Sequence, residues 1–470
     1  MYHQAIIRCS VYNILCSLIS IALVLDRADL TQQNAAKSDY SNEIGSIVDG
    51  ANKLGADLLR IMSNANNNGS LLISPLSLQI ALHILMQGAG EDSETLWEIE
   101  NYLDYDARIK KRGLIHEAMA SLMTSLELDS GKGRYVYDGE RNTKWWKYPT
   151  KFNIANMLIF EKQIANGSRK DFQRGASKYY DIDFHSFDRS EVNFFANLSS
   201  RVNNWISSKT ENSIQLGLDT SELMNSIAVL INAVYLRGQW LFPFCESNTK
   251  HDTFSRRGDK SDNVTVPFMS RVRSYSYLDL RLPIKSAAAS VELDRHKLKL
   301  DTHLDCQVVL LPIDEDGLSM VILLPSKVDG FNKLYDARIN RIMDQMLQSG
   351  ETKKINLKIP RFALEVEYNM KHHFRQLGLK RLSYSPELHR MFELLDVDLD
   401  WIAHKAKINV TEMGIGASTI TAMKIQQSSN DANEIVKPID IIANHPFLYA
   451  VIHESRPAIP LLMGQVISPN

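Results

Sequence analysis

The sequence predicts an α+β fold, in which residues 44–470 form one large domain. Three observations support this prediction. Apolar residues recur at helical spacing near the start of this region, the stretch 226–240 is largely apolar and rich in Val, Ile and Tyr, and two segments after residue 350 alternate apolar and polar residues. The 470 residues are 44% apolar and 23% charged, which excludes a fibrous or wholly disordered protein.

The charge balance gives little indication of a partner. The chain holds 53 Lys and Arg residues against 55 Asp and Glu residues, a formal net charge of −2. Proteins that bind nucleic acid through its phosphates usually carry a clear surplus of basic residues. We therefore expect no nucleic-acid partner.

The N-terminal residues are interpreted as a targeting segment. Arg8 precedes the apolar stretch 11–25, and small residues near its end provide a cleavage site. This stretch has 15 residues, fewer than the ~20 that span a bilayer, which favours a secretory signal peptide over the alternative, a short signal anchor. We expect a signal peptide at 1–22, an N-terminal extension at 23–43, and a secreted, extracellular protein without a membrane segment.

The sequence contains several N-glycosylation triplets, which are typical of an exported protein. We expect glycans at Asn68, Asn166, Asn197 and Asn263, each of which begins an N-x-S/T triplet. A fifth sequon, at Asn409, lies in an apolar, strand-like run and is the least suited to carry a glycan.

Cysteine usage excludes a disulfide-dense scaffold. Two of the four cysteines precede residue 23, so the mature chain keeps only Cys245 and Cys306. These two can pair or stay free, and the sequence leaves both alternatives open.

Three helices are predicted from spacing and capping signals. Residues 44–62 carry apolar side chains on one face and run into an Asn-rich cluster that ends the helix. A second helix follows, with Ser74 as its N-cap, Pro75 at its first position and Gly88 at its end. It is apolar on nearly every side and is therefore predicted to be buried. Residues 191–208 are again amphipathic.

The strand signals gather in the second half of the chain. Residues 226–240 are typical of a central strand. The runs 306–313 and 318–325 flank a turn and predict a β-hairpin. Residues 355–362 and 408–411 alternate with a period of two, so the C-terminal third is expected to be mostly β.

Two stretches, 129–150 and 281–303, are predicted to be surface insertions that loop out of the domain. The first mixes basic and aromatic residues, which indicates a site for a polyanion such as a glycosaminoglycan. The alternative, a solvated loop, is favoured because charge-rich loops are common. The basic and aromatic residues of this insertion include Lys132, Arg134, Arg141, Lys144, Lys147, Trp145, Trp146 and Tyr148.

The sequence carries no motif of a common catalytic, cofactor or metal site. G-x-S-x-G, H-E-x-x-H, C-x-x-C and the phosphate loop are all absent. Ser74 or Ser77 can be combined with His404 and a distant acid into a triad, but a hydrogen-bonded core network is favoured because Ser74 caps a buried helix. We therefore expect neither an enzyme nor a bound cofactor or metal.

The segment 413–423, MGIGASTITAM, has no charge and no proline, and it combines small side chains with high β propensity. The residues that follow, 424–440, are polar and rich in turn formers, which is typical of a stretch that proteases cut. A cut there would allow the upstream segment to pair into a sheet. An ordinary buried strand and loop is the alternative.

Six motifs occur in order between residues 44 and 466. They are ISPLSLQIALHILMQGAG, VLINAVYLRGQW, VVLLPIDEDGLSMVILLP, INLKIPRFALEVEYNM, HKAKINVTEMG and NHPFLYAVIH. Together they resemble the serpins, the serine protease inhibitor family. The resemblance implies the serpin fold, a single domain with three β-sheets, about nine helices and an exposed reactive-centre loop between His404 and Pro446.

The resemblance also assigns roles to residues. Ser74, Ser77, Asn232 and His404 match the shutter, a buried hydrogen-bond network beneath the central sheet, and Trp240 matches the breach, where the loop begins to enter. The matching hinge of the loop consists of Glu412, Gly414, Ile415, Gly416, Ala417, Ser418 and Thr419.

The implied activity is suicide inhibition of an extracellular serine protease by a monomeric inhibitor. The protease attacks the loop and forms an acyl-enzyme. The loop then inserts into the sheet before hydrolysis and distorts the protease within a covalent complex. The inhibitor supplies strain and no catalytic residue.

The hinge departs from the family pattern. Inhibitory members usually carry a small Thr or Ser where this chain has Ile415, and acidic residues where it has Met413 and Gly416. Ile415 is expected to face inward early in insertion, where overpacking costs ~1–3 kcal/mol. The alternative is therefore a non-inhibitory serpin that acts as a carrier, chaperone or binding protein.

The scissile bond is placed by counting. In the family it lies about 16 residues beyond the hinge glutamate, a reach of ~50 Å at ~3.3 Å per residue. This count gives Ser428–Ser429, which suits an elastase-like protease. The alternative, Lys424–Ile425, suits a trypsin-like protease but leaves a short insertable segment.

Overall fold

The computed structural model describes residues 40–65, 69–105, 112–126, 133–138, 143–165, 169–215, 226–256, 262–281, 304–313, 317–327, 331, 333–335, 339–393, 397, 399–416 and 437–469. Within these residues the chain forms ten α-helices and three β-sheets. This confirms the α+β class and the three sheets that the resemblance implied.

A six-stranded sheet forms the centre of the molecule, and its strand order is β12–β13–β14–β6–β4–β5. β6 pairs with β13 in parallel and with β4 in antiparallel orientation. The predicted central strand 226–240 is therefore confirmed, as β6. The six strands are β4 (Lys151–Glu161), β5 (Ile182–Phe187), β6 (Ala228–Gln239), β12 (Phe362–Asn369), β13 (Leu399–Thr411) and β14 (Gly414–Ile415).

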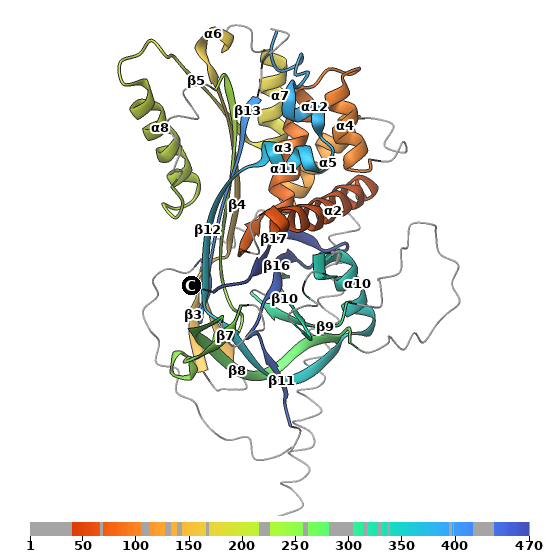
Figure 1. Cartoon of the computed structure of the whole chain (residues 1–470), viewed down its shortest axis with the longest axis vertical. Coiled ribbons are helices and arrows are strands. Elements are labelled where there is room, and N and C mark those ends of the chain that lie inside the picture. Colours follow the sequence, from red (N-terminus) through yellow and green to blue (C-terminus); the bar gives the residue numbers. More distant parts are fainter. Residues whose placement is uncertain are drawn as a thin grey trace, which may run out of the picture.

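A nine-stranded sheet lies at one end of the molecule, below the central sheet in Figure 1. Its β9 and β10 form the predicted hairpin, and β8 also pairs with β7 and β11. The strands are β1 (Leu71–Ile73), β7 (Lys250–Ser255), β8 (Asn263–Asp279), β9 (Cys306–Pro312), β10 (Leu318–Pro325), β11 (Glu351–Pro360), β15 (Ile439–Ile442), β16 (Phe447–His453) and β17 (Ile459–Val466).

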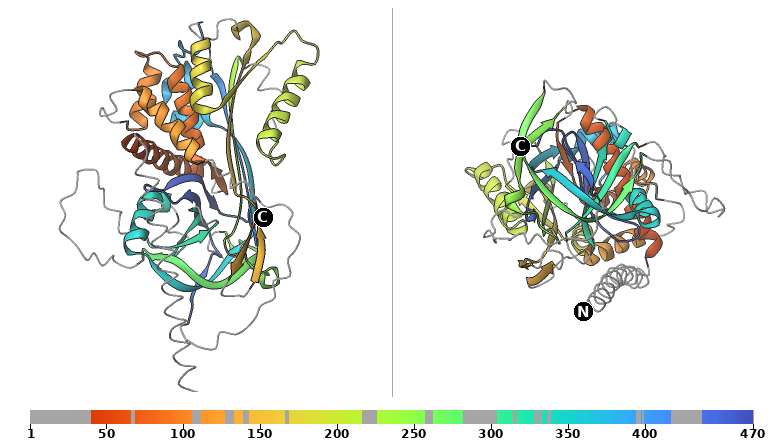
Figure 2. Two further views of the ribbon diagram at one scale, coloured as in Figure 1. Left: turned by 180° about the vertical axis from the view of Figure 1, so that it is seen from behind. Right: turned by 90° about the horizontal axis from the view of Figure 1, so that it is seen from below.

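The helices cover both faces of the central sheet. In Figure 1, and from behind in Figure 2, α8 lies on one face and α3, α5 and α11 lie on the other. The described helices are α2 (Ser41–Ala65), α3 (Pro75–Gly88), α4 (Glu94–Tyr102), α5 (Arg112–Ser125), α6 (Lys162–Ala165), α7 (Lys170–Tyr180), α8 (Phe194–Lys209), α10 (Ile339–Ser349), α11 (Met370–Gln376) and α12 (Lys380–Tyr384), with a short 3-10 turn at Glu246–Asn248.

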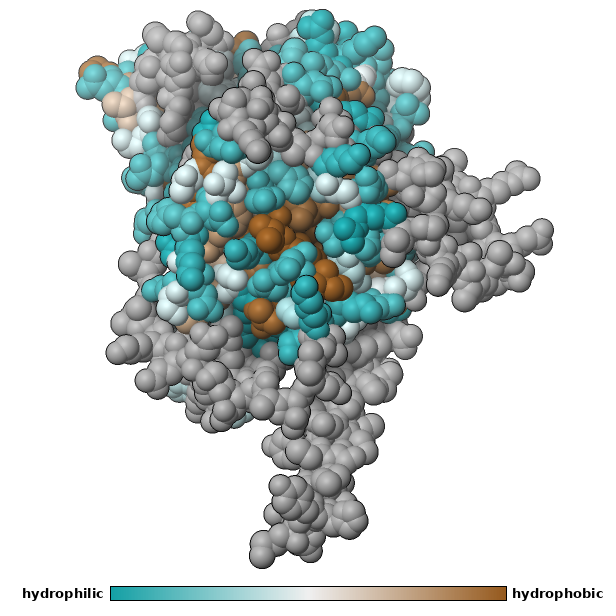
Figure 3. All heavy atoms as spheres, turned by 60° about the horizontal axis from the view of Figure 1, so that its bottom comes forward, coloured by the Kyte–Doolittle hydropathy of each residue, from teal (hydrophilic) through white to brown (hydrophobic). Residues whose placement is uncertain are grey.

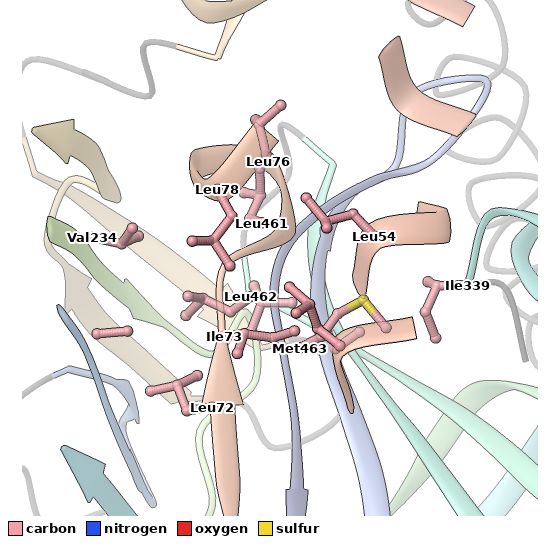
Figure 4. Packing of buried hydrophobic residues seen from close by; sticks show 14 of the residues in the cluster. Leu54, Leu72, Ile73, Leu76, Leu78, Val234, Ile339, Leu461, Leu462 and Met463 are labelled. Carbon is pink, nitrogen blue, oxygen red and sulfur yellow. The ribbon is translucent and has the colours of Figure 1, made fainter. Parts of the chain in front are cut away.

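The three predicted helices are present as α2, α3 and α8. α2 begins three residues before the expected start at Ile44, and α8 begins at Phe194, because the first residues of the predicted helix form a turn. Every residue of α3 except Gln87 is buried, which confirms that it is a core helix. Figure 4 shows its Leu76 and Leu78 packed in one cluster with side chains of α2, β1 and β17.

The insertion 129–150 is not simply a loop. Two strands, β2 (Arg134–Asp138) and β3 (Thr143–Lys147), pair there as an antiparallel two-stranded sheet. Val136 forms a buried cluster with Leu241, which explains why this stretch orders against the end of β6. The second insertion lies outside the described residues from position 282 onward.

No disulfide joins the two cysteines that the structure describes. Cys245 and Cys306 are both buried. Burial and the nearby Asp305 carboxylate raise the pKa of the Cys306 thiol to about 12, so it stays protonated and unreactive.

One face of the molecule carries an apolar patch. In Figure 3, hydrophilic residues surround this patch on the face that is turned forward. Among the described residues, we find no helix long and apolar enough to cross a membrane.

Candidate functional site

A buried polar network joins α3 to the central sheet. Ser74 has the extended backbone of an N-cap, and its Oγ accepts a hydrogen bond from the Ser77 amide at 3.4 Å. The amide of Ser74 donates to Nε2 of His404 on β13 at 3.1 Å. The Ser77 hydroxyl donates to Oδ1 of Asn232 on β6 at 2.8 Å. The four predicted shutter residues therefore lie together.

The bonds of His404 fix its tautomer. Because Nε2 accepts from the Ser74 amide, the proton lies on Nδ1, which donates to Oδ1 of Asn232 at 2.8 Å. The ring is fully buried, and burial lowers its pKa to about 3. The imidazole is therefore neutral and contacts the backbone of Ser74, which supports the core network over a catalytic triad.

One member of the network was missed from the sequence. Asn156 of β4 lies directly opposite Asn232 and accepts a hydrogen bond from its amide at 2.8 Å. Tyr368 of β12 lies opposite His404 in the strand register. A row of polar side chains thus crosses four strands, at the level where α3 begins. A buried Asn within the strand 151–161 is the signal that would have indicated it.

The hinge has already entered the sheet. Residues 411–414 make a tight turn, after which Gly414 and Ile415 form β14 between β13 and β6. The amide of Gly416 donates to the carbonyl oxygen of Asn409 at 2.8 Å, which extends this pairing by one residue. Ile415 is fully buried in the main core. The first residues of the loop that the resemblance implied therefore lie within the sheet.

Two glycines permit this arrangement. Gly414 has φ +150° and Gly416 has φ +68°, values that favour glycine. A Cβ at Gly414 would overlap the carbonyl oxygen of Gly238, and a Cβ at Gly416 would overlap that of Leu236. The inserted hinge therefore requires glycine at both positions.

Glu412 anchors the turn that precedes β14. Its side chain is 2% exposed and its carboxylate contacts Arg361, with Oε1 2.7 Å from Nε and 2.5 Å from Nη2. The hydroxyl of Thr249 donates to the same oxygen. A buried carboxylate requires such partners, and these come from the junction of β11 with β12 and from the start of β7.

Trp240 contacts the same turn and is 1% exposed. Its indole nitrogen donates to the carbonyl oxygen of Thr411 at 2.8 Å, and its backbone amide donates to the carbonyl oxygen of Met413 at 2.9 Å. The predicted breach residue and the start of the hinge are therefore in direct contact.

Other predicted sites divide between the described residues and those outside them. Asn197 on α8 and Asn263 at the start of β8 are exposed. Of the basic residues in the insertion, Arg134 is exposed, whereas Lys147 is buried. The predicted residues outside the described part of the chain are Asn68, Lys132, Arg141, Asn166, Ala417, Ser418, Thr419, Lys424, Ile425, Ser428 and Ser429.

The family model "Serpin (serine protease inhibitor)" matches residues 49–469. The chain belongs to the serpin family.

The relatives are distant but match over nearly their whole length. The chain is 25% identical to Serpin B4 of Homo sapiens over 434 residues, which cover 88% of this chain and 97% of that protein. It is 26% identical to leukocyte elastase inhibitor of Sus scrofa over 422 residues, with the same coverage.

Solved structures share the fold. Human thyroxine-binding globulin superposes with a TM-score of 0.71 at 18% identity, covering 91% of this chain and 100% of that chain. Serpin48 of the insect Tenebrio molitor superposes with a TM-score of 0.68 at 21% identity, covering 91% and 99%.

Proposed function

We propose that this protein is a secreted inhibitor of a serine protease, which is trapped after it cleaves the loop that follows Gly416. The observation that carries the proposal is β14. The hinge already occupies the gap between β6 and β13, while below it these strands pair directly from Leu399 and Ala228 to Ala406 and Val234. The sheet thus holds an added strand at its upper end, and below it β6 and β13 pair directly with each other. We call this direct pairing of β6 with β13 the seam.

The chemistry belongs to the protease. Its serine attacks the carbonyl carbon of the scissile bond, the new N-terminus leaves, and the loop stays attached as an ester. If the freed loop then advances between β6 and β13, the enzyme is carried away from its active geometry before water hydrolyses the ester. The inhibitor's own contribution is the strand that enters and the seam that opens.

Separating β6 from β13 breaks at least one buried side-chain hydrogen bond. The hydrogen bond between His404 and Asn232 crosses from β13 to β6 and has to break when a strand passes between them. Asn232 can keep its contacts to Ser77 of α3 and Asn156 of β4, because neither residue lies on β13. The shutter residues are therefore proposed to control how readily the strands separate.

The residues of the loop agree with insertion. Ala417 and Thr419 continue the alternation of Ile415 and are small, and no proline or charge follows until Lys424. One relative is named a leukocyte elastase inhibitor, and a bond at Ser428–Ser429 would suit an elastase-like target. The bond Lys424–Ile425 is the second candidate, with a trypsin-like target.

A second function, as a non-inhibitory binding protein, is supported by the insertion of the hinge into the sheet. Because Ile415 is locked into the core, the loop can be too restrained to serve as bait, and the protein would then act as a non-inhibitory binding or carrier serpin. Thyroxine-binding globulin, a structural neighbour, is named for a small ligand that it binds.

We also propose export and modification. The apolar N-terminal stretch supports a signal peptide at 1–22, and the exposure of Asn197 and Asn263 makes both available for glycosylation. A polyanion at the 129–150 insertion is supported by the exposed side chain of Arg134. Mass spectrometry of the secreted protein would test the cleavage site and the glycans, and gel filtration would test whether it is a monomer.

The decisive experiment is incubation with trypsin-, chymotrypsin- and elastase-like proteases, followed by denaturing gels and sequencing of the released C-terminal peptide. A complex that survives denaturant establishes inhibition, and the peptide identifies the scissile bond. The control is Ala417→Arg, which places a charge in the entering strand and should give cleavage without a complex. Cleavage of the wild-type protein without a complex by every protease would favour the binding-protein function.

A further inference from the structure

The segment 209–214, which begins at the last residue of α8, crosses the central sheet on the face opposite α3, and we call it the strap. Asn153 of β4 donates to the carbonyl oxygen of Lys209 at 3.1 Å. Ile214 is fully buried in a cluster that includes residues of β6 and β13. The strap therefore contacts the strands on both sides of the seam.

Glu211 fastens the strap to one side. Its Oε1 is 2.5 Å from Nζ of Lys151 on β4, and its Oε2 is 2.7 Å from Nη1 of Arg237 on β6. The Tyr235 hydroxyl of β6 donates to Oε2 at 3.0 Å. One carboxylate thus gathers three side chains from two strands.

A lysine fastens the strap to the other side. Nζ of Lys407 on β13 donates to the carbonyl oxygen of Ser213 at 3.1 Å. The strap is therefore bound to β4 and β6 through Glu211, and to β13 through Ser213 two residues later. Separation of β6 from β13 would stretch these contacts.

These contacts lie at the point where the seam divides. β6 and β13 pair directly up to Val234 and Ala406, whereas β14 separates them from Gly238 and Val410 upward. Tyr235, Arg237 and Lys407 lie in the interval between, which is where the described hinge ends at Gly416.

The backbone of the strap is strained. Glu211 and Asn212 have φ +49° and +59°, a conformation uncommon for residues other than glycine. Hydrogen bonds from Asn212 to Ser207 and from Ser213 to Thr210, both 2.9 Å, hold this shape. A strained segment keeps its conformation only while its contacts are made, so the strap is suited to being released.

We propose that Glu211 is a positioning residue that sets the rate at which the loop enters the sheet. Its contacts hold the strap over the interval between the direct β6–β13 pairing and β14. They thereby keep the hinge at its observed depth until β6 and β13 separate. This rests on the proposed strand insertion and adds to it a specific restraint, outside the hinge and the shutter, that determines whether insertion outruns hydrolysis of the ester.

The test measures strand entry without a protease. A synthetic peptide with the sequence of residues 417–428 is incubated with the uncleaved protein, and its incorporation is followed on native gels. Glu211→Gln keeps the shape but removes the charge, and we expect incorporation about tenfold faster, because ion pairs and a hydrogen bond of this partly exposed kind each contribute modestly. Tyr235→Phe removes only the hydroxyl, which contacts Glu211 and Ser213, and should give a smaller acceleration.

Asp188→Asn is the matched control. Asp188 pairs with Lys162 at 3.3 Å before α8 begins, away from the seam, and its loss should leave the rate within about twofold of wild type. Salt gives an independent readout. Added salt should accelerate incorporation into the wild-type protein and have less effect on Glu211→Gln, because it screens ion pairs that the variant lacks.

The outcomes separate the two proposals. Equal rates for Glu211→Gln and Asp188→Asn, or equal salt responses for wild type and Glu211→Gln, would overturn the role of Glu211 and leave strand insertion intact. Failure of the peptide to enter any variant would overturn strand insertion and the inference together. Urea unfolding of each variant, with unchanged midpoints, would exclude general destabilisation as the cause of a faster rate.

Discussion

Ile415 lies directly opposite Gly238 of β6, and its side chain is fully buried in the main core. The pairing explains how a bulky residue fits where overpacking was expected. Gly238 presents no side chain, and a Cβ there would meet Ile313, so the sheet is shaped to admit the hinge at this level. The isoleucine therefore stabilises a hinge that is partly inserted, instead of obstructing it.

Truncating Ile415 should destabilise the protein. Ile415→Ala removes a fully buried side chain, and we expect the free energy of unfolding to fall by about 2–4 kcal/mol, measured by urea denaturation. Ile415→Val is the matched control, at about 0.5–1.5 kcal/mol. A loss below 0.5 kcal/mol for the alanine variant would mean, at about the resolution of such data, that the hinge is not in the sheet.

Glycine at 414 should be required for β14 to pair. In Gly414→Ala the new Cβ would overlap the Gly238 carbonyl, and the hinge should leave the sheet. Hydrogen exchange would report this, because the Gly416 amide would lose its partner Asn409 and exchange faster. Gly378→Ala separates the effect of a positive φ from that of steric overlap. Gly378 also has a positive φ but has open space around its Cβ, so its substitution should leave exchange at Gly416 unchanged.

The ion pair of Glu412 should matter more than an exposed pair. Glu412→Gln removes a buried charge from Arg361, which is itself partly exposed, so we expect a loss of about 1–3 kcal/mol. Glu365→Gln, which weakens the pairs of this half-exposed carboxylate with Lys405 and Lys407, should cost at most about 1 kcal/mol. Equal losses would contradict the buried role of Glu412. A double-mutant cycle with Arg361→Met would measure the coupling itself.

Local patterns were sufficient for much of the fold. The capping signals at Ser74 and Pro75, together with an all-apolar sequence, predicted the buried helix α3 because both properties are local. The apolar run of β6 and the alternating segments of the C-terminal third were predicted for the same reason. The shutter residues were found by resemblance, and the structure brings them within hydrogen-bonding distance.

Long-range partners were not predictable from local patterns. Arg361 and Thr249 lie 51 and 163 residues from Glu412, and no local signal links them. How far the hinge inserts depends on whether its residues are more stable in solvent or between β6 and β13 beside Gly238. This balance involves three strands at once. The pairing of β2 with β3 was missed because charge-rich composition outweighed the β-forming Tyr and Val residues of that stretch.

Stability should fall below neutral pH because of His404. Its pKa is lowered to about 3 by burial, whereas an unfolded histidine has a pKa of about 6.5. Above about pH 6.5 neither state binds the proton, so stability is full. As the pH falls, the unfolded state binds the proton first, and stability is lost until the folded pKa is reached.

The size of this loss is set by linkage. Between about pH 7.5 and pH 5.5, His404 should account for a loss of about 1.4 kcal/mol in the free energy of unfolding. His404→Gln should lose that much less over the same interval, whatever its stability at neutral pH. Urea unfolding at both pH values would measure the difference, with the exposed His251→Gln as control for the loss of a histidine. Parallel pH dependences for wild type and His404→Gln would show that His404 is not a buried neutral group, and that the seam between β6 and β13 is held by other contacts.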